Sequence, residues 1–132
     1  MAKLCLNYRS GNDSVLGDIL KIKIDEQITA EVNKNEIYEI DLENGNHNIK
    51  MYYQGWTEND MVGYLDQNIM VNGDTYLIYK SPATIYGKAK LIQKNFNSVE
   101  EFRKFVAKKN KIAKIVGIIL FIIALIILFI FN

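Results

Sequence analysis

The fold of this chain is decided by residues 19–32, which read ILKIKIDEQITAEV. Apolar and polar side chains alternate before the pair Asp25-Glu26, and they alternate again after it. A period of two places successive side chains on opposite faces of a β-strand, so each half is typical of a strand with one buried face. The stretch therefore predicts two short strands joined by a tight turn.

The same period recurs through residues 2–92. The other alternating segments are AKLCLNYR (2–9), IYEIDL (37–42), HNIKMYYQ (47–54), LDQNIMV (65–71), TYLIYK (75–80) and ATIYGKAKLI (83–92). Turn-forming residues separate these segments, and the pairs Asn44-Gly45 and Asn72-Gly73 are typical of hairpins. About eight short strands at regular spacing predict a mainly β domain over residues 1–97, an antiparallel β-sandwich of about seven or eight strands.

A helical period replaces the strand pattern near residue 98. Ser98 is followed three residues later by Glu101, which is the spacing of a capping box. The apolar residues that then share one helical face are Val99, Phe102, Phe105 and Val106. We expect a short basic amphipathic helix over residues 98–111. Two interpretations of this helix remain open, because it either lies on an anionic membrane surface or docks its phenylalanine face on the sandwich.

Residues 112–131 differ from everything before them. From Ile115 to Phe131 there is no charged and no polar side chain, and the apolar residues cover every face of a helix. At 1.5 Å per residue this run is roughly 25 Å long, which is close to the thickness of the hydrocarbon core of a bilayer. We predict a C-terminal transmembrane helix over residues 112–131.

Charge is unevenly distributed about this predicted span. Residues 1–97 hold 10 Lys and Arg against 13 Asp and Glu, whereas residues 98–132 hold 6 against 2. The basic residues before the span are Arg103, Lys104, Lys108, Lys109, Lys111 and Lys114, and we expect them to contact the membrane surface. Because Lys and Arg are retained on the cytoplasmic side, we predict a tail-anchored, single-pass protein of the cell membrane. Its sandwich is expected in the cytoplasm and its C-terminus outside.

Residues 22–53 resemble the small bacterial β-sandwich repeats of the PEGA and carboxypeptidase-regulatory-like type. The features at positions that this pattern expects are Asp25, the turn at residues 33–36, Gly45, His47 and Ile49. The sequence departs from the pattern at Glu26, where glycine is usual, and at Asn44, where proline is usual. The resemblance implies a structural or binding module and carries over no active-site residue. The abundance of Asn, Lys and Ile also leads us to expect a bacterial source.

Residues with catalytic or metal-binding potential are few. His47 is the only histidine and Cys5 the only cysteine, so no multi-histidine metal site and no internal disulfide are available. The acidic residues expected in loops, which form no metal-binding ladder, are Asp13, Glu36, Glu58 and Asp60. We therefore expect no enzyme, no cofactor and no metal. The mildly acidic sandwich also lacks the basic face of a nucleic-acid-binding protein.

The longest predicted loop, QGWTEND (54–60), carries the only tryptophan. Loops held by a rigid scaffold commonly carry function, and exposed tryptophan is a frequent interaction hot spot. We expect Trp56, Glu58 and Asp60 to contact a partner protein or ligand, at the end of the sandwich farther from the anchor. In the alternative interpretation, Trp56 folds back and caps the end of the core. The predicted function is thus a binding or adaptor module at the membrane. The alternatives are a pore-forming or oligomerising effector, with Gly117 and Ala124 on one helix face, and a membrane-tethered enzyme.

Overall fold

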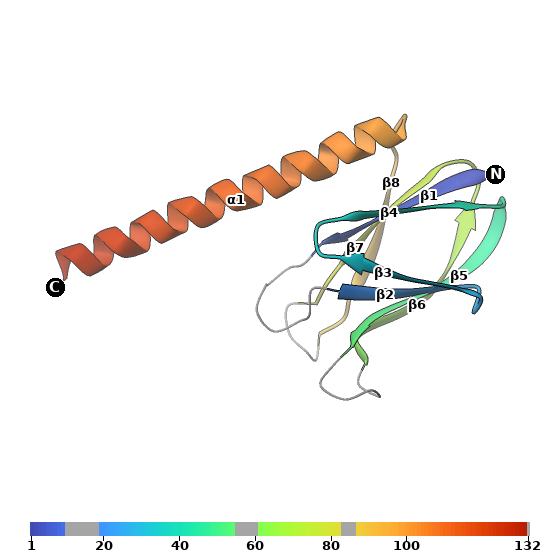
Figure 1. Cartoon of the computed structure of the whole chain (residues 1–132), viewed down its shortest axis with the longest axis horizontal. Helices are drawn as coiled ribbons and strands as arrows, with labels where there is room; N and C mark the ends of the chain where they lie inside the picture. Colours follow the sequence, from blue (N-terminus) through green and yellow to red (C-terminus); the bar gives the residue numbers. More distant parts are fainter. Residues whose placement is uncertain (10–18, 55–60, 83–86, 132) are drawn as a thin grey trace.

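The computed structural model describes residues 1–9, 19–54, 61–82 and 87–131, which fold into two four-stranded sheets and one long helix (Figure 1). Sheet A contains, in spatial order, β4 (Ile37–Leu42), β1 (Ala2–Arg9), β7 (Thr75–Lys80) and β8 (Lys90–Lys94). Sheet B contains β3 (Ile28–Asn33), β2 (Ile19–Ile24), β5 (Gly45–Gln54) and β6 (Met61–Val71). The helix, α1, spans Val99–Ile130. The predicted antiparallel sandwich followed by a helix long enough to cross a membrane is confirmed, and only the β1–β7 pair is parallel among the described strands.

The core lies between the two sheets and is built from the alternating positions of the sequence. Leu4, Leu6 and Tyr8 of β1 point inward from sheet A, opposite Leu20, Ile22 and Ile24 of β2 in sheet B. All six are at most 3% exposed. Each Å² of apolar surface removed from water contributes about 25 cal/mol to stability, which makes this shared core the main source of stability in the sandwich.

The two Asn-Gly pairs do not form hairpins, contrary to expectation. Asn44-Gly45 connects β4 of sheet A to β5 of sheet B, and Gly73 lies between β6 of sheet B and β7 of sheet A. The Asn44 Oδ1 atom accepts a hydrogen bond from the Gly73 backbone N–H at 3.1 Å, which ties the two corners together. The strands on either side of each turn belong to different sheets, so the chain passes from one sheet to the other at these turns instead of forming a hairpin.

The turn between β2 and β3 is a true hairpin, as the opening stretch predicts. Asp25 and Glu26 both have positive φ angles, of 52° and 58°, and the Gln27 N–H donates to the Ile24 carbonyl at 3.1 Å. This is the geometry of a type I′ turn, which normally favours glycine at its second central position. The Glu26 carboxylate forms ion pairs with Lys23 and Lys50, and these contacts help to hold the turn in its strained backbone conformation.

Asp25 also binds His47, at the opening of β5. Asp25 Oδ2 lies 2.6 Å from His47 Nδ1, and the Glu43 carbonyl oxygen lies 2.7 Å from His47 Nε2. Both ring nitrogens therefore face acceptors, an arrangement that only the doubly protonated imidazolium satisfies. The hydrogen bond to Asp25 raises the pKa of His47 above 6.5, and the same bond lowers the pKa of Asp25 below 3.8. Two residues highlighted by the sequence pattern thus form one ion pair that joins two turns.

This ion pair predicts a stability maximum at mildly acidic to neutral pH. The contribution of His47 is complete below its ordinary pKa and is lost as the pH rises through its raised folded value. The contribution of Asp25 is present above its ordinary pKa and is lost as the pH falls through its lowered folded value. We expect the thermal midpoint of the full chain in detergent to decrease as the pH is raised above 6.5. His47→Gln should flatten this decrease, and an unchanged slope in the variant would assign the pH dependence to other groups.

Candidate functional site

The helix α1 is the candidate functional element, and its first turn is fixed by the residues that the capping-box spacing identified. Ser98 Oγ accepts a hydrogen bond from the Glu101 N–H at 3.2 Å, while Glu101 Oε2 accepts one from the Asn97 N–H at 2.9 Å. Glu100 and Glu101 also lie where the positive end of the helix dipole favours acidic side chains. From this start the two predicted segments, residues 98–111 and 112–131, form one helix that is continuous as far as Ile130.

The first part of α1, residues 99–110, docks on the outer face of sheet A. Phe102 and Val106 are 0% and 4% exposed and pack in a second apolar cluster with Cys5, Tyr76 and Ile78. Phe102 lies against Tyr76 and Phe96, with ring centroids 5.2 Å apart in both pairs. Of the two interpretations left open by the sequence, the structure therefore shows the docked helix.

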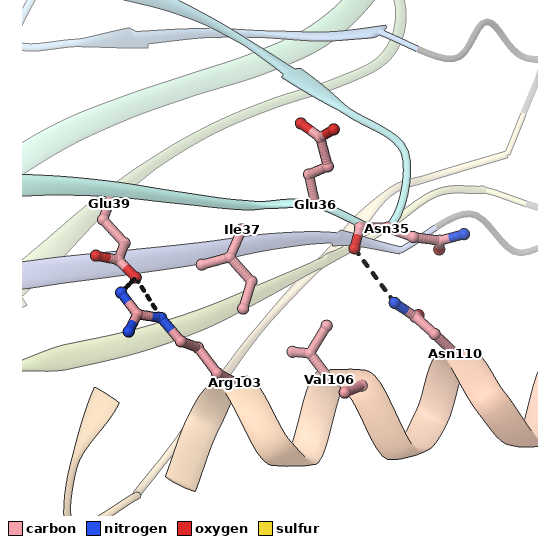
Figure 2. A pocket seen from close by; sticks show the side chains of 8 residues that line it. Asn35, Glu36, Ile37, Glu39, Arg103, Val106 and Asn110 are labelled. Atoms are coloured by element: carbon pink, nitrogen blue, oxygen red, sulfur yellow. Dashed lines mark hydrogen bonds and ion pairs between the residues drawn. The ribbon is translucent and has the colours of Figure 1, made fainter. Parts of the chain in front are cut away.

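Polar contacts flank this apolar interface where α1 passes the edge strand β4 (Figure 2). The Arg103 guanidinium donates to the Glu39 carboxylate through Nε at 3.1 Å and Nη2 at 2.7 Å, and it also pairs with Glu100. One turn beyond Val106, Asn110 Nδ2 donates to the Asn35 carbonyl at 3.3 Å. Between these contacts the strand and the helix border an open groove of about 490 Å³. The polar contacts set the position of α1 along β4.

The direction of α1 follows from these contacts. The helix begins after β8 at the end of the sandwich where β4 joins β5, and it then runs back over sheet A (Figure 1). Its contact with Asn35 shows that it leaves the sandwich at the opposite end, which holds the turn between β3 and β4. We call this the anchor end. The strand ends Gln54 and Met61 pair with each other at the same end as this turn.

This geometry corrects the expected placement of the loops. The predicted position of Trp56, Glu58 and Asp60 is at the end of the sandwich farther from the anchor, and it assumes that β8 leads straight to the membrane. The flanking strand ends, Gln54 and Met61, lie instead at the anchor end, since the docked helix adds one pass along the sandwich before the apolar segment begins. Trp56, Glu58 and Asp60 themselves lie outside the described residues.

The second part of α1 has no partner within the described chain. Ile118, Leu120 and Phe121 are 60%, 61% and 65% exposed, and Phe129 is 90% exposed. None of the most apolar window of this helix is buried. An uninterrupted apolar surface of this size is unfavourable in water, whereas in lipid the helix satisfies its own backbone and its side chains are solvated by acyl chains. The structure thus supports a single candidate membrane-spanning helix.

The basic residues predicted to contact the membrane occupy two different settings. Arg103 is bound to Glu39, and Lys109 lies over the Phe105 ring, 5.7 Å from its centroid. Those with exposed positions on α1 are Lys104, Lys108, Lys111 and Lys114. Lys104 is level with the docked segment, whereas Lys111 and Lys114 directly precede the apolar segment. The cations nearest to a membrane would therefore be the last ones.

The two broad faces of the sandwich differ because α1 covers only one of them. The outer face of sheet B carries Tyr52 and Tyr64, whose ring centroids are 6.5 Å apart. Tyr64 and Met61 are 48% and 53% exposed, and the tyrosines border a shallow hollow of about 300 Å³. Lys23, Glu26 and Lys50 line the rest of the hollow. An exposed aromatic and methionine surface with a charged margin is typical of protein interfaces.

Cys5 and His47, the only cysteine and the only histidine of the sequence, have separate structural roles. Cys5 is fully buried beneath α1, and this burial raises the pKa of its thiol to about 11, so the thiol is neutral at physiological pH. His47 is bound by Asp25 and by the Glu43 carbonyl. Within residues 1–9, 19–54, 61–82 and 87–131, no group of three His, Cys, Asp or Glu side chains is arranged to hold a metal ion.

Comparison with protein-family models, curated proteins and solved structures yields no match to this chain. The functional interpretation consequently depends on the helix and on the surfaces that it covers or leaves open.

The docked interface makes a direct prediction about stability. Phe102→Ala removes a fully buried ring, and such truncations typically cost about 3–5 kcal/mol of unfolding free energy. Ile118→Ala, which truncates an exposed side chain on the same helix, should change the unfolding free energy by less than about 0.5 kcal/mol. Urea unfolding of the full chain in mild detergent, followed by the β-sheet circular dichroism signal, measures both. Equal effects of the two variants would mean that α1 does not stabilise the sandwich.

Proposed function

We propose that this protein is a membrane-anchored binding module, in which α1 crosses the cell membrane once and holds the β-sandwich at the cytoplasmic face. The observation that carries the proposal is the division of α1 into a docked part and a bare part. A helix that served only to cover sheet A would not need several further turns with apolar residues on every side. The docked part also couples the sandwich rigidly to the span.

The cytoplasmic orientation is supported by the distribution of charge along α1. Lys111 and Lys114 stand immediately before the apolar segment, and no basic residue follows them in this chain. If Lys111 and Lys114 lay on the external side, the protein would depart from the usual retention of Lys and Arg in the cytoplasm. The lone, buried Cys5 is also consistent with a reducing compartment.

The binding role is supported by the exposed face of sheet B. Because α1 covers sheet A, a partner protein at the membrane has its broadest accessible surface on sheet B, around Tyr52 and Tyr64. The resemblance of residues 22–53 to PEGA-type repeats also implies a binding module, and these residues include the second half of β2, all of β3 and β4, and most of β5. The prediction for Trp56, Glu58 and Asp60 stays a prediction, because these residues lie outside the described part of the chain.

Membrane insertion and orientation can be tested together in bacterial cells. The buried Cys5 thiol should not react, so a single introduced cysteine reports its own location. Asn72→Cys, at an exposed turn of the sandwich, should react with a membrane-impermeant maleimide only after the cells are permeabilised. Asn132→Cys should react in intact cells. The reverse labelling pattern would overturn the orientation, and release of the full chain by alkaline carbonate would overturn the spanning helix.

A matched substitution checks that insertion depends on the bare part of α1. Leu120→Asp with Ile123→Asp places two charges near the middle of the span, each costing about 2.5–3.5 kcal/mol in a bilayer. This variant should be released by carbonate, whereas Lys104→Asp on the docked part should remain in the membrane fraction.

The binding surface is tested by photo-crosslinking in native membranes. A benzophenone amino acid at Tyr64 should crosslink one defined partner protein, and the same group at Lys104, which is exposed on the opposite side of the sandwich, should not. Tyr64→Ala should then reduce co-purification of that partner at least about tenfold, as expected when a hot-spot side chain worth more than 1.4 kcal/mol is lost. Crosslinks at both positions, or none at Tyr64, would exclude sheet B as the specific interface.

A further inference from the structure

Three cations lie side by side on one rung of sheet A. Arg9 of β1 is the register partner of Lys80 of β7, and Lys80 is in turn the partner of Lys90 of β8. Among the residues that the structure describes, none of the three forms an ion pair, and Lys80 and Lys90 are exposed. Like charges on adjacent strands repel each other and destabilise a sheet. In the described part of the chain no ion pair offsets this repulsion.

The row lies on the face of sheet A that α1 covers. Ile78, two residues before Lys80 on β7, and Ile92, two residues after Lys90 on β8, belong to the apolar cluster beneath the helix. Residues two apart on a strand point to the same side. Arg9, Lys80 and Lys90 thus continue the helix-facing surface beyond the point where its apolar part ends.

The row is also level with the point where α1 leaves the sandwich. The Asn35 N–H donates to the Tyr8 carbonyl at 2.8 Å, next to Arg9, and the Asn35 carbonyl accepts from Asn110. The uncharged segment begins at Ile115, only five residues later, which corresponds to about 7.5 Å of helix. If this segment is in the hydrocarbon core, the cationic row lies at the depth of the lipid headgroups.

We propose that Arg9, Lys80 and Lys90, together with Lys111 and Lys114 of α1, bind the phosphate groups of anionic phospholipids and hold the anchor end of the sandwich against the membrane. This inference rests on the proposed function, because it requires α1 to span the bilayer. Guanidinium and ammonium groups both bind phosphate, and each basic residue close to an anionic leaflet favours the bound state about fivefold. The sandwich would then stand on its anchor end, with the tyrosine face of sheet B directed sideways and open to a partner.

The test uses the full chain reconstituted in nanodiscs. A fluorophore on Gly87→Cys, an exposed position next to β8, reports energy transfer to a headgroup-labelled acceptor lipid. We expect greater transfer in discs that contain phosphatidylglycerol than in discs of phosphatidylcholine alone. The difference should disappear in 1 M salt, where the Debye length is about 3 Å. It should also disappear in the Arg9→Gln, Lys80→Gln, Lys90→Gln variant. The control, Lys21→Gln, Lys23→Gln, Lys50→Gln, removes the same charge from the outer face of sheet B and should retain the difference.

The outcomes separate this inference from the proposed function. Failure of the wild-type chain to co-elute with the discs would overturn the spanning helix and, with it, the lipid site. Co-elution with no phosphatidylglycerol dependence, or with equal loss in both triple variants, would overturn the lipid site alone. Binding of glycerol phosphate by the chain in detergent, with no phosphatidylglycerol dependence in the discs, would show that a free phosphate ligand, not a lipid headgroup, occupies the row.

Discussion

The packing of Phe102 and Val106 against sheet A is the contact on which the rest of the architecture depends. It buries a second apolar cluster outside the sandwich core, built from Tyr76, Ile78 and the ring of Phe96. Without it the outer face of sheet A would expose apolar side chains to water. With it, a helix that continues into an apolar segment is attached to the folded domain over three turns and not through a flexible linker.

One consequence of this attachment is that the sandwich has a defined orientation relative to the helix axis. The Arg103–Glu39 and Asn110–Asn35 contacts prevent α1 from sliding along β4, because each pairs a specific side chain with a specific position on the strand or on the turn before it. A domain on a flexible tether samples many orientations. A domain held in this way presents one end to the membrane and the same lateral face to its surroundings.

The two ends of the sandwich also differ in their charged side chains. The end remote from the anchor holds Asp25 and Glu26, which are paired there with His47, Lys23 and Lys50. The anchor end holds the row formed by Arg9, Lys80 and Lys90. An anionic surface attracts the cations of the anchor end, which agrees with the orientation that the helix imposes.

The local properties of the chain were determined by the sequence by itself. Alternation identified the strands because burial of one face requires a period of two, and the uncharged run from Ile115 identified a segment suited to lipid. The sequence also determined the start of α1 at Ser98, since capping depends on neighbours only three residues apart. These features need no information about distant parts of the chain.

Only the tertiary structure decided which strands are neighbours and which way α1 runs. The Asn-Gly pairs predicted hairpins, but a turn specifies only a change of direction. It does not specify the sheet in which the next strand is placed. Likewise Phe102 could have faced lipid or protein, because its apolar face suits either, and the choice depends on a complementary patch assembled from Cys5, Tyr76 and Ile78 of two strands distant in sequence. The cationic row of Arg9, Lys80 and Lys90 could not be predicted from the sequence for the same reason, since only the register of the paired strands brings these residues together.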